Sequence, residues 1–277
     1  MSPFQQVPSF GGPISTLTSI APSGGGSGTP QLTHTAYHNE VFSSNVTQSS
    51  MTHSFTGIPA IPAGGTGMRV INVQIAYRPL SSKTTTADNA KAWYGESPWG
   101  SAQSLSMGGS SFSFSGWGAT DFNGVSNWTK TVDLTGSQTV TYSFPSCNGS
   151  EYAISLFVLD YITQWEDSWF YIWNGASGMT SQTSMNNSGP SLTGQTHALR
   201  IIGCVLSNSS NNPTYTKGAS EPTYTFLGAG DNGTNERNST YYAFETTSSS
   251  VNQNGTIATS SAASGGLAGT GLIIGLK

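Results

Sequence analysis

Charged residues are scarce in this sequence. It has nine Lys and Arg and 13 Asp and Glu among 277 residues, or 8% of the chain, whereas about 25% is usual in a soluble domain. A coiled coil or long-helix protein, which would be about half Ala, Glu, Lys, Leu and Arg, is therefore excluded. Nine basic residues and a net charge of −4 also exclude the positive surface with which proteins bind nucleic acid.

Long apolar runs, cysteines and a targeting segment are also lacking. No apolar run reaches the roughly 18 residues of a membrane-spanning helix. Met1 is followed by Ser-Pro-Phe, with neither the basic nor the apolar segment of a secretory signal, so we expect a chain that is made in a cytoplasm or has lost its signal. The two cysteines, Cys147 and Cys204, are too few for a disulfide framework, and whether they pair stays open.

Small neutral residues and aromatic residues dominate what is present. The chain has 44 Ser, 34 Thr and 34 Gly, together about 40% of all positions. Seven Trp, eleven Tyr and twelve Phe can fill a substantial core, because each buries a large area. This composition favours a β-rich protein with a neutral, hydroxyl-rich surface.

The first 67 residues differ from the rest of the chain. They contain no Lys or Arg, one acidic residue, Glu40, and repeated Pro and Gly, which mark turns and irregular segments. We therefore predict an extended, Pro/Gly/Ser-rich N-terminal arm over residues 1–67, with short strands near residues 31–36 and 40–46, and a β-sandwich body over residues 68–277. An arm without basic residues cannot neutralise phosphates, so we expect it to bind protein.

The body shows strand patterns and no helical period. Apolar and polar residues alternate from Ile71 to Tyr77, as in a strand with one buried face. The apolar run at residues 152–162 favours a central strand covered on both faces, and residues 132–134 and 140–144 around Gly136-Ser137 indicate a hairpin. Further strands are expected at residues 112–114, 169–173, 198–206, 213–216, 222–226, 241–244 and 272–276. The sequence thus predicts an all-β fold, a β-sandwich of jelly-roll type.

Four aromatic residues are the candidate ligand or interface residues: Trp165, Trp169, Tyr171 and Trp173. On a strand, the last three share one face. An exposed aromatic strip can stack on sugar rings, whereas a buried one fills the core of a sandwich. We favour core and interface packing, and the exposure of the rings distinguishes the two interpretations.

No motif identifies a reaction, so we expect a protein that is not an enzyme. Asp160, Glu166 and Asp167 could supply the two carboxylates of a glycosidase, but no other pattern supports catalysis. We therefore expect Asp160→Asn and Glu166→Gln to be silent.

No cofactor-binding or metal-binding residue is predicted either. His34 and His38 have a metal-ligand spacing only on a helix, which the surrounding residues do not favour. Residues 231–236 are rich in oxygen ligands but lack the full spacing of a calcium loop.

In composition and pattern, the chain resembles structural proteins of virus particles, in particular decoration, tail and fibre proteins of tailed phages. The shared features are low charge, abundant Ser, Thr, Gly and Asn, a β-sandwich body, a Pro/Gly-rich arm and no signal peptide. The resemblance implies a virion protein that is an external capsid decoration or cement, or a tail or fibre component. Its partners would be other copies of itself, as a trimer by analogy, and other virion proteins.

Two alternatives stay open. One is a carbohydrate-binding β-sandwich that recognises a glycan on a host surface. The other is a secreted or surface-layer structural protein.

Overall fold

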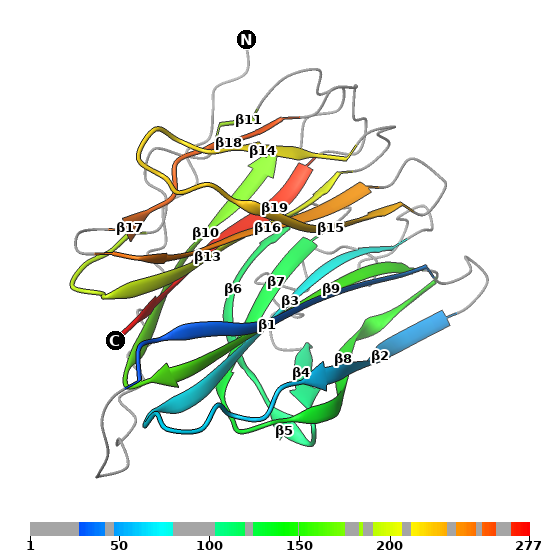
Figure 1. The fold of residues 1–277 in the computed structure, drawn as a ribbon. Coiled ribbons are helices and arrows are strands. Elements are labelled where there is room, and N and C mark those ends of the chain that lie inside the picture. The colour runs from blue at the N-terminus through cyan, green and yellow to red at the C-terminus, as the bar shows by residue number, and fades with distance from the viewer. Residues whose placement is uncertain are drawn as a thin grey trace.

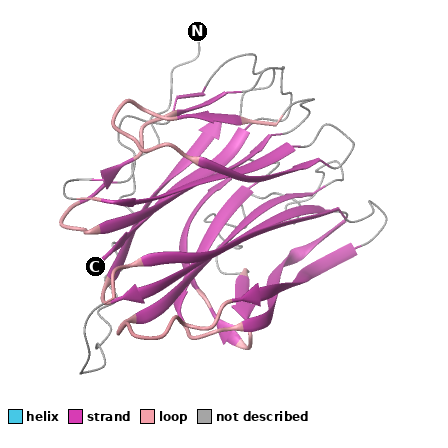
Figure 2. Ribbon diagram, viewed as in Figure 1, coloured by secondary structure: helices cyan, strands magenta, loops and turns pink. Residues whose placement is uncertain are grey.

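The computed structural model describes residues 28–41, 47–79, 103–119, 124–148, 150–174, 183–184, 191–206, 212–231, 237–247, 251–258 and 267–277. Strands and their connections make up these residues, and no helix occurs among them (Figure 2). The predicted all-β class is confirmed. In this part of the chain there is accordingly no helix that could cross a membrane.

The strands fall into two sets along the chain. The first set is β1 (Gln31–Val41), β2 (Thr47–Ile58), β3 (Met68–Pro79), β4 (Ser104–Met107), β5 (Ser110–Ser111), β6 (Ser113–Ala119), β7 (Gly124–Thr131), β8 (Gly136–Asn148) and β9 (Ser150–Ile162). The second set is β10 (Trp165–Asn174), β11 (Thr183–Ser184), β12 (Ser191–Leu192), β13 (His197–Leu206), β14 (Thr214–Thr216), β15 (Thr225–Asp231), β16 (Arg237–Thr246), β17 (Val251–Asn252), β18 (Thr256–Ala258) and β19 (Leu267–Leu276). We call them the first and second halves.

The sheets stack in four layers (Figure 1). Outer sheet 1 has the strand order β2-β8-β4-β5, and inner sheet 1 has the order β1-β9-β3-β7-β6. Inner sheet 2 has the order β10-β19-β13-β16-β15. Outer layer 2 consists of the sheet β11-β18-β14 and the pair β12-β17. Each half therefore supplies one inner and one outer layer, and the two inner sheets face each other.

Both halves have the same nested, antiparallel pairing. In the first half, β1 pairs with β9, β2 with β8, β3 with β7 and β4 with β5. In the second half, β10 pairs with β19, β11 with β18, β12 with β17 and β13 with β16. An additional edge strand follows in each inner sheet, β6 beside β7 and β15 beside β16.

Strands of the inner sheets are buried on both faces, as predicted for residues 152–162. Ile154 and Leu156 of β9 join the core between inner sheet 1 and outer sheet 1, whereas Phe157 and Leu159 join the core between the two inner sheets. The C-terminal apolar run likewise forms the inner strand β19, between β10 and β13.

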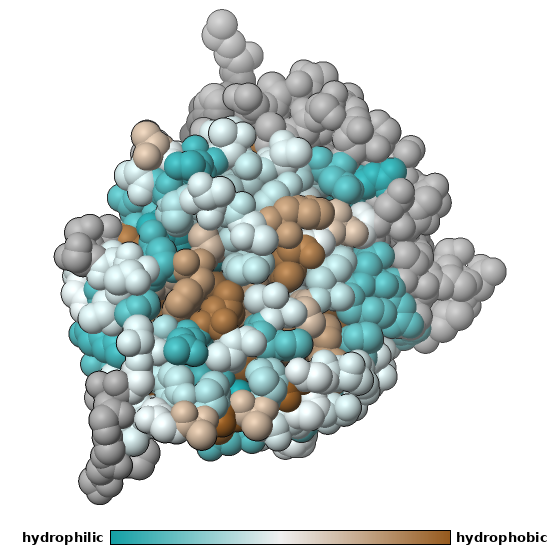
Figure 3. All heavy atoms as spheres, viewed as in Figure 1, coloured by the Kyte–Doolittle hydropathy of each residue, from teal (hydrophilic) through white to brown (hydrophobic). Residues whose placement is uncertain are grey.

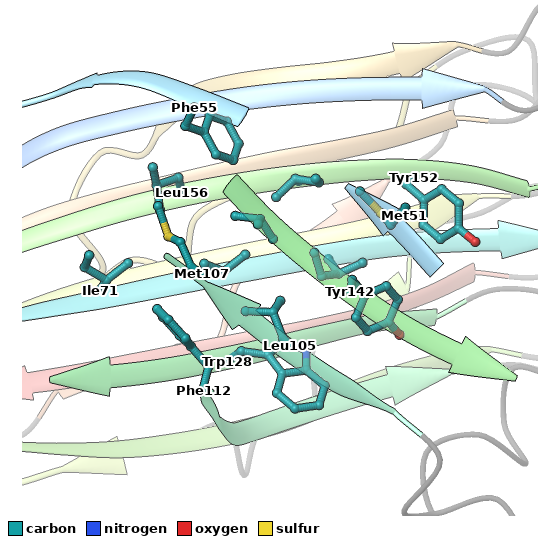
Figure 4. Close-up of a cluster of buried hydrophobic side chains, with 14 of the residues drawn as sticks. Met51, Phe55, Ile71, Leu105, Met107, Phe112, Trp128, Tyr142, Tyr152 and Leu156 are labelled. Atoms are coloured by element: carbon teal, nitrogen blue, oxygen red, sulfur yellow. The ribbon is translucent and has the colours of Figure 1, made fainter. Parts of the chain in front are cut away.

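The core of the first half is rich in aromatic side chains (Figure 4). The ring centroid of Phe144 lies 5.1 Å from that of Tyr152, 5.5 Å from that of Tyr142 and 5.8 Å from that of Tyr77. Aromatic pairs at such distances contribute about 0.5–1.5 kcal/mol beyond the area they bury. The space between these two sheets is thus filled by the protein's own rings.

A buried ion pair connects five segments of the first half. The Arg69 guanidinium donates from Nε to Asp160 Oδ1 at 2.7 Å and from Nη2 to Asp160 Oδ2 at 2.8 Å, and both side chains are inaccessible to solvent. Its Nη1 donates to the carbonyl oxygens of Pro59 and Leu134, while Thr33 of β1 donates to Asp160 Oδ2 at 2.6 Å. The pair therefore joins β1, β3, β9 and the connections that follow β2 and β7.

The predicted boundary at residue 67 is wrong for residues 31–58. β1 pairs with β9 in inner sheet 1, and β2 pairs with β8 in outer sheet 1, where Met51 and Phe55 belong to the core. Composition alone indicated an arm because Gly and Pro are frequent in the connections that flank these strands. Residues 1–27 lie outside the described residues.

Glycine has a packing role next to these strands. Tyr161 adopts a positive φ of 63°, and its ring lies where side chains on Gly28 and Gly65 would be, 2.5 Å and 2.0 Å from their ideal Cβ positions. Only glycine lets the backbone approach so closely.

The predicted hairpin at residues 132–144 is also wrong. β7 ends at Thr131 in inner sheet 1, and β8 begins at Gly136 in outer sheet 1. Val132 and Leu134 cover the core from the connection between the sheets.

Asp160→Asn is expected to lower the free energy of unfolding by about 3–5 kcal/mol, because it leaves the buried Arg69 charge without a counter-charge. This replaces the expectation of a silent substitution. Denaturant unfolding of the full chain measures the loss. Glu166→Gln is the control, since Glu166 accepts a hydrogen bond from the neutral Gln195 and its replacement leaves no charge unpaired. Equal losses in the two variants would contradict the role given to Asp160.

Candidate functional site: the matching edges of the two halves

The candidate aromatic residues lie on β10, at one edge of inner sheet 2. Trp165 is 3% exposed, belongs to the core between the inner sheets, and donates from Nε1 to Thr131 Oγ1 at 3.0 Å. Trp169 is partly buried against the same core. The side chains of Tyr171 and Trp173 lie outside the described residues. Trp165 and Trp169 therefore pack against other side chains of the protein.

The structure draws attention to two other edge strands, β6 and β15. Each contains the pattern Phe-x-Gly-x-Gly, at residues 114–118 and 226–230. In each, the pairing with the next strand shifts between the Phe and the first Gly, at Phe114/Gly116 and at Phe226/Gly228. The two halves thus carry the same bulged edge at corresponding places.

Each first glycine of this pattern accommodates an aromatic ring from the opposite inner sheet. An ideal Cβ on Gly116 would lie 2.4 Å from Trp169 Cγ, and one on Gly228 would lie 2.4 Å from Tyr37 Cδ1. β6 lies against β10, and β15 lies against β1. The two sides of the sandwich formed by the inner sheets are therefore closed in the same way. On one side a ring of the second half covers a glycine of the first half, and on the other side a ring of the first half covers a glycine of the second half.

Each phenylalanine of the pattern is exposed. Phe114 is 43% exposed and packs edge-on against Trp128, at 5.1 Å between centroids. Phe226 is 52% exposed and lies 5.3 Å from Tyr241. Figure 3 shows brown, apolar atoms near the middle of the face that it presents, among mostly hydrophilic and neutral ones. We call Phe114 with Trp128, and Phe226 with Tyr241, the edge patches.

A buried polar layer lies between the inner sheets. Gln74 donates from Nε2 to Asn127 Oδ1 at 3.0 Å, and Asn127 donates from Nδ2 to Thr270 Oγ1 at 3.5 Å. Thr240 donates to Gln74 Oε1 at 3.3 Å and shares a hydrogen bond of 2.9 Å with Ser155. Because an unsatisfied buried polar group is costly, this layer favours one alignment of the two halves.

The structure does not bring the candidate carboxylates together in one site. Asp160 binds Arg69 in the first half, while Glu166 accepts a hydrogen bond from Gln195 in the second half. Asp167 is 5% exposed. Asp160 and Glu166 are thus each held by a partner within their own half.

Glu221, which the sequence analysis did not single out, holds the connection between β14 and β15 in place through hydrogen bonds. Its Oε2 accepts hydrogen bonds from Tyr215 Oη at 2.6 Å and from the Gly218 amide at 2.7 Å, and its Oε1 accepts one from the Asn254 amide at 2.7 Å. Burial, together with Tyr224 and Glu221, raises the pKa of Tyr215, which keeps that hydroxyl a donor. No spacing signal in the sequence marks this cluster.

The remaining candidate residues have separate surroundings. His34 and His38 both lie on β1, and the described residues contain no group of three His, Cys, Asp or Glu side chains that could hold a metal ion. Cys204 is a free, buried thiol whose pKa burial raises to about 12. Of the oxygen-rich segment at residues 231–236, residues 232–236 lie outside the described residues.

Comparisons with protein-family models, curated proteins and solved structures find no match to this chain.

Gly116→Ala and Gly228→Ala are each expected to destabilise the fold by about 1–3 kcal/mol, because the added methyl group collides with an aromatic ring. Gly116 should be the more sensitive, since its φ of +138° also disfavours a side chain. Thermal and denaturant unfolding measure both effects. Ser113→Ala, at an exposed position of β6, is the control and should change the free energy of unfolding by less than about 0.5 kcal/mol. If Tyr37→Leu does not reduce the cost of Gly228→Ala, the proposed collision is wrong.

Proposed function

We propose that this protein is a non-enzymatic structural protein of a virus particle, formed by two jelly rolls in tandem, and that copies of the chain assemble through neutral edges. The observation that carries the proposal is the repeated nested pairing of strands. The jelly roll is an architecture of viral capsid proteins, and also of lectins and cupins.

The strand order of the first half supports the jelly roll. In that architecture the first strand pairs with the last, the second with the next to last, and so on inward, with successive pairs alternating between two sheets. Here β1-β9 and β3-β7 lie in inner sheet 1, and β2-β8 and β4-β5 lie in outer sheet 1. Only β6 is additional.

The second half supports the same topology. Its inner sheet repeats the order of the first, and β14 lies beside β18 as β4 lies beside β8. The segments β11 and β12 together take the place of β2, and β17 and β18 together take the place of β8.

A fold does not determine a function, so the choice among jelly-roll proteins depends on the site. Tyr77, Tyr142, Phe144 and Tyr152 fill the space between the sheets of the first half, where a ligand-binding relative would need room. Trp165 and Trp169 are used in packing between the halves. Both observations favour a structural role over carbohydrate binding.

The edge patches are suited to contacts between copies of the chain. Charged residues are absent from β6, and β15 has only Asp231, so covering these edges requires little desolvation of charge. Edge strands also carry backbone groups that another chain can pair with or cover. Because each half carries one edge patch, every copy offers the same kind of contact twice, as a subunit that tiles a surface requires.

Charge supports a position in the particle away from the genome. The first 67 residues contain no Lys or Arg, so this part of the chain is not suited to contact a genome. A shell, decoration or cement protein fits a repeated edge contact better than a tail fibre. Residues 1–27 enter this proposal through their sequence alone, as a neutral arm that binds neighbouring subunits.

The purified full-length chain is expected to form closed symmetric oligomers or larger ordered assemblies, visible by sedimentation and electron microscopy. Phe114→Ser with Phe226→Ser should weaken association about tenfold or more, the effect of losing a contact worth about 1.4 kcal/mol. The fold should remain intact because both side chains are exposed. Ile61→Ser, at a residue 37% exposed in the connection between β2 and β3, is the matched control.

Three outcomes would contradict this function. A chain that stays monomeric at all concentrations and binds a glycan would support the carbohydrate-binding alternative. Recovery of the chain from a cell envelope, rather than from purified particles, would support the surface-layer alternative. Equal weakening by Ile61→Ser would show that the edge patches are not the specific contact.

A further inference from the structure

Two histidines are in contact where the edge strands of the two sheets of the first half, β1 and β2, lie next to each other. His38 lies on β1 of inner sheet 1, and His53 lies on β2 of outer sheet 1. Their imidazole rings are stacked, with centroids 3.5 Å apart and planes 11° from parallel. The ring pair therefore forms a side-chain contact between two separate sheets.

Glu40 supplies the nearby negative charge. Its Oε2 atom lies 3.5 Å from His38 Nε2, and the two side chains are 39% and 28% exposed. On the other side, Phe55 lies edge-on to His53 with centroids 4.6 Å apart. One carboxylate and an apolar ring thus flank the two imidazoles.

In the strands paired with β1 and β2, the residues directly opposite the two rings do not titrate, and the nearest titratable partners are Tyr152, opposite Glu40, and Tyr142, opposite Met51. His53 lies opposite Val140 of β8, between Thr139 and Thr141. His38 lies opposite Ile154 of β9, between Ala153 and Ser155. Further along β1, His34 is influenced by Arg69, so it belongs to a different electrostatic environment.

We propose that His38 and His53 form an acid-sensitive clasp, which holds the edges of the two sheets together near neutral pH and releases them when both rings are protonated. Neutral imidazoles stack favourably, whereas two imidazolium ions at this distance repel each other, and a single carboxylate can compensate only one of them. This inference does not depend on the proposed function.

The electrostatics of His53 support the clasp. Burial lowers the pKa of His53, the neighbouring His38 lowers it further, and Glu40 opposes both effects. A histidine with a lowered pKa binds protons less readily in the clasped state than in the opened state. The clasp is therefore fully stabilising above the ordinary histidine pKa of about 6.5 and is lost progressively as the pH falls below it.

A local measurement is needed to test this, because the pKa of other histidines in the chain is lowered too. Burial also lowers the pKa of His34 and of His197, which stacks on Phe244 in the second half. Both therefore add to a global loss of stability in acid. Only His38 and His53 are expected to control the opening of β1 and β2.

Hydrogen exchange of the full-length chain between about pH 7.5 and about pH 5, the interval in which histidine changes charge, provides the test. After correction for intrinsic rates, β1 and β2 should lose protection several-fold more than β13 and β19. His38→Gln and His53→Gln should each remove this extra loss, whereas His34→Gln and His197→Gln should keep it. The inference is overturned if both clasp variants keep it, or if it disappears in His34→Gln.

A second measurement keeps the test decisive if a variant perturbs the fold. In a titration followed by NMR, the pKa of His53 should rise in His38→Gln, because a neighbouring positive charge is removed. It should fall in Glu40→Gln, which leaves both rings in place. An unchanged His53 pKa in both variants would show that the three groups are not coupled, and would overturn the clasp.

Discussion

Burial of both faces of the two inner sheets is the constraint to which the rest of the structure responds. A strand such as β9 or β19 needs apolar or small neutral residues at nearly every position, since neither face meets water. The outer layers exist in this architecture to cover the second face of each inner sheet. Low charge follows from the same cause, because a charge placed there would lose its hydration. Arg69 and Arg200 are buried in these sheets and each is held by a carboxylate, and Asp167 of β10 is buried as well.

The two halves solve the same problem with different side chains. The first half fills its sandwich with aromatic rings. The described part of the second half combines smaller groups, such as Ala198, Val251 and Ile273, with a cluster of Tyr215, Tyr224 and Tyr241. What they share is the nested pairing and the bulged Phe-x-Gly-x-Gly edge. The edge is the same in both halves although their cores differ. We therefore connect this edge with contacts outside the chain.

Between the halves, apolar and polar contacts have different roles. Val70, Leu159, Ile201 and Leu272 form part of an apolar core at one end of the interface, which contributes most of the attraction. The amide and hydroxyl layer around Gln74 aligns the sheets, and Gly203 leaves the space that Gln74 occupies, since its ideal Cβ would lie 2.2 Å from Gln74 Oε1. In the proposed assembly, such a fixed interior would hold the two edges at a constant spacing.

Local pattern alone determined the all-β class, the central strand at residues 152–162 and the strand at the C-terminus. Period and composition suffice there, because they report which side chains can lie on a buried sheet. The tertiary structure decided that β1 and β2 belong to the sheets, that Trp165 and Trp169 are packed between the halves, and that His38 meets His53. These depend on partners far away in the chain, such as Thr33 and Asp160, 127 residues apart. The repeated Phe-x-Gly-x-Gly was visible in the sequence, but a pattern this short acquires meaning only when pairing places both copies at equivalent edges.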